Sequence, residues 1–164
     1  MLTVRTAGRA DIAAIDALLA RAYPRLLKPD YAPSVLVTAI PIIARAQPAL
    51  VTCDTYFVVE DQGAIIGAGG WTAVIPGENR SETRRGNVRH LVTDDRQVRR
   101  GVGRALMEHI FASARGAGMG WMHCTSTITA VPFYQAMGFA IRTKVLVPLA
   151  PGIGFPAVAM ARLL

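Results

Sequence analysis

The order of hydrophobic and polar residues predicts one strand and then helices in the first third of the chain. Leu2–Thr6 fits a strand, and Ala10–Tyr23 carries apolar residues at helical spacing until Pro24, which we expect to end the helix. The stretch Tyr31–Pro48 has similar periodicity but contains Pro41. A proline inside a helix removes a backbone hydrogen bond and kinks or breaks the helix. We therefore predict two short helices joined at Pro41.

The middle of the chain predicts an antiparallel hairpin followed by a loop. Thr55–Glu60 and Ala64–Val74 are rich in strand-forming residues, and the turn Asp61-Gln62-Gly63 separates them. Pro76–Gly86 has almost no apolar residue, so we expect a surface loop there.

The second half of the chain alternates strands with helices. The predicted elements are a strand Asn87–Thr93, a polar link Asp94–Arg100, a helix that Gly116 and Gly118 end, a strand Met119–Thr125, a short helix Ala130–Met137 and two closing strands, Phe139–Val147 and Phe155–Leu163. The first of these helices has Val102, Leu106, Ile110 and Ala114 on one face. This order predicts an α/β (α+β) fold with a central, mixed but mostly antiparallel sheet that contains one parallel crossover.

Length and composition predict a single domain, residues 1–164. With 52% hydrophobic and 18% charged residues, a chain of 164 residues buries roughly 70% of its extended surface on folding. The longest apolar run, Val35–Ala44, is about half of what a bilayer requires. There is no secretory pattern at the N-terminus and there are only two cysteines, so we expect a cytoplasmic protein without a disulfide framework or a membrane partner.

Positive charge is concentrated in one segment. The formal net charge is +7, and Arg80–Arg104 contains eight arginines against three acids, a local balance of +5. Such a patch suits a nucleic acid, an acidic membrane surface or a polyphosphate ligand, or it is solvated surface. Charge alone leaves these alternatives open.

The chemistry inside this segment favours an anion site. Arg99-Arg100-Gly101-Val102-Gly103-Arg104 opens the predicted helix, where free backbone N–H groups bind anions and glycine lets a ligand approach closely. A P-loop is excluded because GxxxxGK[ST] is absent, and the dinucleotide fingerprint is excluded because Leu106 stands where it needs a third glycine.

A second segment lies about thirty residues further on. Ala130-Val131-Pro132-Phe133-Tyr134-Gln135-Ala136-Met137-Gly138-Phe139 fits a short helix with proline near its start and a glycine cap. Together with the glycine loop and the element order, it resembles the GCN5-related N-acetyltransferase (GNAT) superfamily over essentially the whole chain. The resemblance implies a sheet of about six or seven strands flanked by about four helices, acetyl-CoA as the acyl donor, and no metal.

The resemblance also assigns binding residues for acetyl-CoA. The strand residues would pair with the pantetheine arm, and the loop residues would bind the pyrophosphate. Val98 departs from the family's Gln or Arg, and Thr129 stands where many members have Asn. The residues assigned to the acyl donor are Leu91, Val92, Thr93, Val98, Arg99, Arg100, Gly101, Val102, Gly103, Arg104, Thr129 and Phe133.

Acetyl transfer requires a proton donor and a proton acceptor. The resemblance makes Tyr134 the group that protonates the departing thiolate, because a phenol near pKa 10 stays protonated at neutral pH. An alkylammonium acceptor must lose a proton, and the candidates to take it are Glu60, His90, His123 and the substrate-side loops. His90, on the strand expected to hold the acetyl group, has a pKa suited to a base, or it is a packed or surface histidine. Family members that carry the base on this strand usually have it at the position that is Arg89 in this sequence. An arginine is not a base at neutral pH, and Arg89 would instead hold an acidic group of the substrate.

The sequence thus predicts an acetyl-CoA-dependent N-acyltransferase that acts on a small-molecule or peptide amine by direct attack, without nucleic acid and with a homodimer allowed. The alternatives are a GNAT-like domain that binds coenzyme A without turnover and a basic nucleic-acid-binding module. The acceptor side would be set by the early helices and the last hairpin, where Tyr23, Tyr31, Trp71 and Phe155 are either pocket or core residues.

Overall fold

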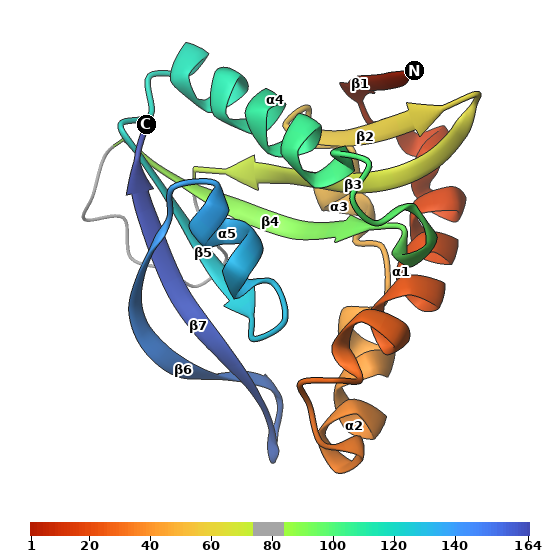
Figure 1. Cartoon of the computed structure of the whole chain (residues 1–164), viewed down its shortest axis with the longest axis vertical. Helices are drawn as coiled ribbons and strands as arrows, with labels where there is room; N and C mark the ends of the chain where they lie inside the picture. Colours follow the sequence, from red (N-terminus) through yellow and green to blue (C-terminus); the bar gives the residue numbers. More distant parts are fainter. Residues whose placement is uncertain (74–83) are drawn as a thin grey trace.

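A single seven-stranded sheet organises the chain (Figure 1). The computed structural model describes residues 1–73 and 84–164. The strands lie in the order β1-β2-β3-β4-β5-β7-β6 and are antiparallel except for β4 and β5. Their bounds are β1 Leu2–Thr6, β2 Tyr56–Asp61, β3 Ala64–Thr72, β4 Arg85–Thr93, β5 Trp121–Thr127, β6 Ala140–Ala150 and β7 Ile153–Leu163. The predicted mixed sheet with one parallel crossover is confirmed.

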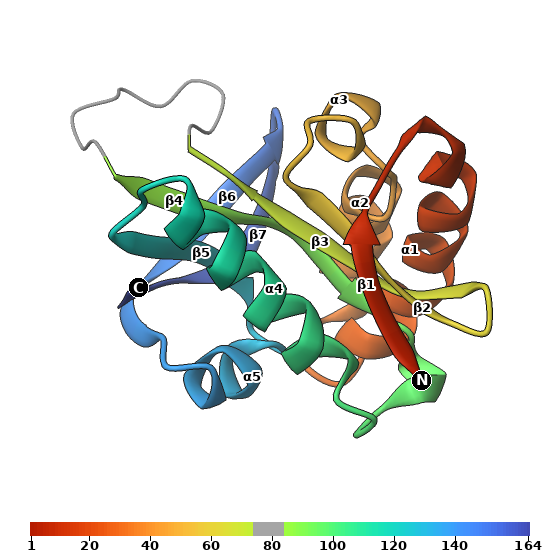
Figure 2. The same cartoon turned by 90° about the horizontal axis from the view of Figure 1, so that it is seen from above.

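Five α-helices cover the two faces of the sheet, as Figure 2 shows from above. They are α1 Ile12–Leu27, α2 Pro33–Ile43, α3 Pro48–Val51, α4 Val102–Gly116 and α5 Val131–Ala136. Buried residues of α1, α2 and α3 form one core cluster, and those of α4 and α5 form a second on the other face. Within the described residues no helix combines the length and the apolar character needed to span a membrane.

Both helix-breaking predictions are wrong. Pro24 lies inside α1, which continues to Leu27, and Pro41 lies inside α2, so the break between the helices comes after Ile43. Pro41 cannot donate to the carbonyl of Val37 one turn earlier. Pro41 and Val37 are both exposed, so water can satisfy that carbonyl. Near the end of α1, burial of Leu27 to 2% exposure offsets the bond lost at Pro24.

The hairpin is confirmed, whereas the last residues of the expected loop belong to a strand. Gln62 and Gly63 join β2 to β3 with φ values of +50° and +79°, which fits a tight hairpin turn. Of the expected loop Pro76–Gly86, residues 76–83 lie outside the described residues. Arg85 and Gly86 already belong to β4, because they pair with Trp121 and Met122 of β5.

Strands β4 and β5 separate after a short paired stretch (Figure 1). Their parallel pairing ends at Asn87 and His123. Further along β4, the register with β3 shifts so that His90 and Leu91 both lie opposite Gly69, and His90 has a φ of +50°. This is a β-bulge, which bends a strand and leaves a residue outside the ladder. The gap between β4 and β5 opens on this side.

Candidate functional site

A cavity of about 440 Å³ lies at the opening between β4 and β5. Its walls come from α1, the end of β4, the loop before α4, the first turn of α4, the end of β5 and α5. The lining residues are Tyr23, Leu26, Leu27, Leu91, Val92, Thr93, Gln97, Val98, Arg99, Gly101, Val102, Gly103, Arg104, Thr127, Thr129, Ala130, Phe133, Ala136 and Met137. One cavity therefore joins the β4 bulge to the start of α4.

Two buried tyrosines hold the bulge. The Tyr56 hydroxyl donates to the His90 carbonyl at 2.9 Å, and the Tyr23 hydroxyl donates to the Leu91 carbonyl at 3.0 Å. Burial raises the pKa of both phenols, so both remain protonated donors at neutral pH. The carbonyls that the bulge takes out of the sheet are satisfied by these side chains.

The start of α4 is an uncapped helix N-terminus at the cavity wall. Gly101 precedes the helix with a φ of +76°, a left-handed conformation that glycine adopts without steric cost. No side chain caps the helix, and the first helical bond runs from the Ala105 amide to the Gly101 carbonyl. The amides of the first turn thus have no helical partner, and Arg99 and Arg104 at the same wall add positive charge.

The two glycines of the loop serve different purposes. A Cβ on Gly101 would meet nothing within 4 Å, so this position borders open space. A Cβ on Gly103 would lie 2.9 Å from the Phe133 ring. Besides the ligand approach expected of both glycines, Gly103 therefore lets α4 pack closely against α5.

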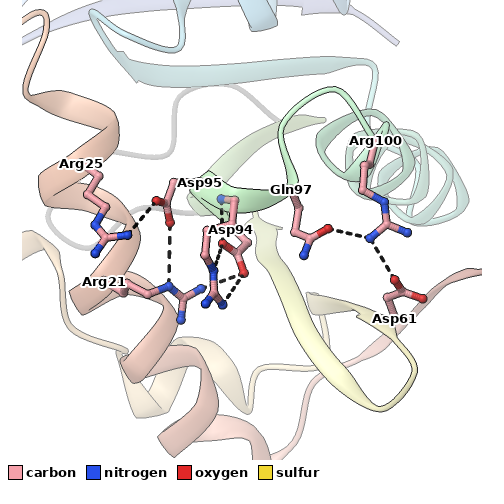
Figure 3. A network of polar contacts seen from close by, with 8 residues as sticks. Arg21, Arg25, Asp61, Asp94, Asp95, Gln97 and Arg100 are labelled. Atoms are coloured by element: carbon pink, nitrogen blue, oxygen red, sulfur yellow. Dashed lines mark hydrogen bonds and ion pairs between the residues drawn. The ribbon is translucent and has the colours of Figure 1, made fainter.

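Ion pairs fix the loop before α4 on the side of α1 (Figure 3). Asp94 is 2% exposed and caps the short turn that follows by accepting from the Arg96 amide at 2.9 Å. Its other oxygen accepts from Arg21 of α1 at 2.8 Å, and Asp95 pairs with Arg25 at 3.4 Å. Burial alone would raise the pKa of Asp94, but the hydrogen bonds from Arg96 and Arg21 outweigh it and lower that pKa to about 2.

A second contact fixes the other side of the loop. Arg100 pairs with Asp61 at the β2–β3 turn, 2.9 Å away, and donates to Gln97 at 2.6 Å (Figure 3). Arg100 is the one residue among the twelve assigned to the acyl donor that does not line the cavity; the other eleven do. Its guanidinium is used to hold the loop.

Thr129 has an unsatisfied polar atom at the cavity wall. Its Oγ1 is buried and has no hydrogen-bond partner among the residues that the structure describes. A buried hydroxyl without a partner costs free energy, so a ligand that donates or accepts there would gain from it. This supports a ligand contact at the position where the sequence departs from the common Asn.

Tyr134 lies behind the cavity wall formed by its neighbour Phe133. Its ring makes edge contacts with Phe133 and Phe139, at centroid distances of 5.4 and 5.2 Å, and it is 5% exposed. Burial, with Cys124 and Tyr23 nearby, raises the pKa of Tyr134 well above its usual value. Its hydroxyl makes no hydrogen bond to any described residue, so it is available as a donor.

His90 is held away from the cavity lining. Its Nε2 lies 2.8 Å from the Ile43 carbonyl, which can only accept, so Nε2 carries the proton and Nδ1 keeps its lone pair. Burial lowers the pKa of His90, although the Ile43 bond opposes this. The ring is therefore neutral at pH 7. Glu60, another candidate base, is engaged in an ion pair with Arg5 at 2.5 Å.

The aromatic candidates on the acceptor side divide between wall and core. Tyr23 lines the cavity. Tyr31 stacks on Phe155 at 4.6 Å and donates to the Pro156 carbonyl at 2.7 Å. Trp71 donates to Ser113 of α4 at 2.9 Å on the other face of the sheet. Three of the four are therefore core residues.

Sequence reasoning missed the parts of the wall supplied by the end of α1 and by the end of α5. Leu26 and Leu27 follow Pro24, where we expected the helix to have ended. Ala136 and Met137 follow Tyr134 and carried no chemical signal of their own. Among residues 1–73 and 84–164, no group of three or more His, Cys, Asp or Glu side chains is arranged to hold a metal ion.

Comparison with known proteins adds sequence and fold evidence. A sequence model described as acetyltransferase (GNAT) domain matches residues 53–141. None of the curated proteins compared with this chain matches it in sequence.

Several solved structures share the fold at low sequence identity. A GCN5-related N-acetyltransferase from Rhodopseudomonas palustris has a TM-score of 0.80 and 17% identity, covering 99% of this chain and 95% of its own. The PaiA N-acetyltransferase of Thermoplasma acidophilum, in complex with coenzyme A, has a TM-score of 0.76 and 9% identity, with 100% and 99% covered. A mosquito arylalkylamine N-acetyltransferase-like protein has a TM-score of 0.71 and 13% identity, with 100% of both chains covered.

The Asp94 carboxylate gives the first testable prediction. Because the pKa of Asp94 is lowered in the folded chain, its ionised carboxylate stabilises the fold at pH values above the unfolded-state pKa near 3.9. This stability is lost as the pH falls towards the folded-state pKa of about 2. We expect Asp94→Asn to lower the free energy of unfolding at pH 7 and to flatten its decrease between pH 5 and pH 2, as measured by urea unfolding. An identical pH dependence in the variant and the wild type would contradict this account. Asp16→Asn is the control, because Asp16 is exposed on α1 and the bond that it accepts from the Ala46 amide at 2.9 Å can also be made by an asparagine oxygen.

Proposed function

This chain belongs to the acetyltransferase (GNAT) family, and on that premise we propose that the cavity between β4 and β5 binds acetyl-CoA for transfer of its acetyl group to an amine. The observation that carries the proposal is that one cavity connects an open helix N-terminus with the bulge of β4. An elongated ligand with phosphates at one end and a reactive group at the other fits that arrangement.

The phosphate end would lie at the start of α4. Gly101 would let the pyrophosphate approach, and the free amides of the first turn would donate to its oxygens, with Arg99 and Arg104 as counter-charges. Val98 offers no hydrogen-bond donor, so the backbone would supply the contact expected from a side chain there. The pantetheine arm would run along Leu91, Val92 and Thr93 towards the bulge, with Thr129 and Phe133 on the opposite wall.

Transfer would proceed by direct attack in a ternary complex. The amine nitrogen attacks the thioester carbon, the C–N bond forms, and the C–S bond breaks to release the thiolate of coenzyme A. Tyr134, which its raised pKa keeps protonated, would donate to that sulfur. The proposal places the enzyme among the acyl-CoA-dependent N-acyltransferases.

The amine must lose a proton before it attacks. An ammonium of pKa about 10.4 is deprotonated at pH 7 at a cost of roughly 4.6 kcal/mol. We assign the proton to His90, directly or through water, because its neutral ring keeps a lone pair on Nδ1. His90 does not line the cavity, which favours the route through water.

The charge distribution favours this function over nucleic-acid binding. Arg96 and Arg100 within the basic segment are paired with Asp94 and Asp61. Arg99 and Arg104 of the same segment line the cavity, and this arrangement suits a compact polyphosphate. The alternative is a domain that binds coenzyme A without turnover. Measuring the release of the coenzyme A thiol over a panel of amines decides between the two.

The predictions of a single domain and of a cytoplasmic location fit the same proposal. Residues 1–164 would form one domain, which the single sheet running from β1 to β6 supports. Cys53 and Cys124 are both free thiols, which suits the reducing cytoplasm. A homodimer stays a prediction.

Gly101 tests the phosphate site. Gly101→Ala places a methyl group in the open space at the cavity wall, and we expect the Kd for coenzyme A to rise roughly tenfold, a loss of about 1.4 kcal/mol. Gly118→Ala is the matched control, because Gly118 has a similar φ of +84° and also borders open space, beyond the opposite end of α4. Both variants lose about 1 kcal/mol of stability from backbone strain. Equal Kd values by calorimetry would remove Gly101 from the site.

Tyr134 tests the chemistry. We expect Tyr134→Phe to keep the packing and the affinity for acetyl-CoA while lowering turnover roughly a hundredfold, measured as thiol release over a panel of amines. Tyr31→Phe is the control, because it removes another buried hydroxyl, bonded at 2.7 Å, and lowers stability instead. A Tyr134→Phe rate within threefold of wild type would mean that another group or solvent protonates the sulfur.

His90 tests the base. If it accepts the proton, kcat/KM rises with pH through an apparent pKa below the ordinary histidine value of about 6.5, and His90→Gln removes that inflection. Because the folded pKa is lowered, the unfolded chain binds the proton more readily, so stability falls as the pH drops below about 6.5 and the variant lacks this loss. A His90→Gln profile that keeps the inflection, and shifts with the pKa of the amine, would make His90 structural.

A further inference from the structure

Arg89 is a cation without a counter-ion among the residues that the structure describes. It is partly buried on β4, and its one hydrogen bond to these residues runs from Nη1 to the Thr72 hydroxyl at 3.1 Å. No carboxylate among the described residues lies within ion-pair distance of it. The arginines of the neighbouring loop differ, because Arg96 and Arg100 each have an aspartate within 3.2 Å. Removing water from a guanidinium on folding costs free energy when no anion replaces the water, and a bound anion would offset that cost.

Arg89 lies on the face of the sheet opposite α4. Val88, its neighbour, packs in the core beneath α4, and alternation along the strand turns Asn87 and Arg89 to the other side. The contact with Thr72 agrees with this, since Asn87 also donates to the Thr72 carbonyl, at 3.2 Å. This is the side on which α1, α2 and α3 lie (Figure 2).

The position of Arg89 along β4 relates it to the reacting group. Asn87 is the last residue of β4 paired with β5, so Arg89 lies where the two strands begin to separate. Leu91, which lines the cavity, is two residues further on, and because the bulge at His90 lies between them the separation is at most the roughly 6–7 Å of a regular strand. An amine that reacts near Leu91 therefore has room for a few bonds between its nitrogen and a group held by Arg89.

We propose that Arg89 binds a carboxylate of the acceptor, so that the substrate is an amine that carries a carboxylate a few bonds from its nitrogen, as an amino acid does. The inference rests on the proposed function and adds the substrate class to it. The planar guanidinium matches a carboxylate bidentately, and its single positive charge matches a single negative one. Arg89 is then a specificity residue for the acceptor and has no part in binding coenzyme A.

Matched pairs of amines test the proposal. The probes are glycine, β-alanine, 4-aminobutyrate and phenylalanine, each against its own amide, with kcat/KM measured by thiol release from acetyl-CoA. The amino group of each amide has a lower pKa than that of the matching carboxylate, so a larger fraction of the amide is neutral and able to attack. This difference alone would make the amides the faster substrates, opposite to the expected result. We expect at least one carboxylate to exceed its amide about tenfold, a difference of about 1.4 kcal/mol.

Variants attribute that preference to Arg89. Arg89→Gln should reduce the carboxylate's kcat/KM to the level of its amide while the amide's own value and the Kd for coenzyme A stay within twofold. Arg89→Lys should restore part of the preference, because it keeps the charge but not the fork. Arg45→Gln, an exposed arginine after α2, is the control and should change nothing.

The outcomes separate this inference from the proposed function. Equal rates for carboxylates and amides, a preference that survives Arg89→Gln, or a stronger preference for O-phosphoethanolamine would overturn the carboxylate assignment while leaving acetyl transfer in place. Absence of turnover with every amine, despite coenzyme A binding, would overturn the proposed function instead. Calorimetry of the N-acetyl amino acids against their amides, with coenzyme A present, would then decide the inference: binding of the carboxylates that is lost in Arg89→Gln supports it, and equal binding ends it.

Discussion

The parallel pairing of β4 with β5 spans only three residues of each strand, and the cavity depends on its ending there. A strand that leaves its partner exposes backbone groups that must bond elsewhere. The bulge at His90 turns β4 away, and Gly69 makes room for it, since a Cβ there would lie 3.1 Å from the Leu91 backbone. The hydroxyls of Tyr23 and Tyr56 then hold the displaced carbonyls from the side of α1. The opening is therefore a stable part of the fold.

The charges around this opening are divided between holding the loop and facing the cavity. Asp94 and Asp61 neutralise arginines on the two sides of the loop, and their ion pairs fix its path before any ligand arrives. Arg99 and Arg104 remain at the cavity wall. A ligand that meets charges already in position avoids the cost of ordering them on binding.

The sequence predicted the order of the elements and most of the acyl-donor wall, because hydrophobic periodicity and a glycine loop at a helix start are local signals. It failed at Pro24 and Pro41, where burial and solvation in the folded chain outweigh a local rule. It also could not foresee that Arg100 holds the loop, because its partner Asp61 is far away in sequence. The bulge at His90 was equally hidden, since it arises from register with a neighbouring strand.

One hydroxyl has a consequence for the order in which the molecule is built. Tyr31 donates to the carbonyl of Pro156 and accepts from the amide of Ile128, partners that follow it by 125 and 97 residues. On a ribosome, the helices near the N-terminus emerge long before either partner exists. Tyr31 cannot have both bonds until β7 has been synthesised and has paired with β5. This side of the sheet is consequently completed only when the final hairpin docks.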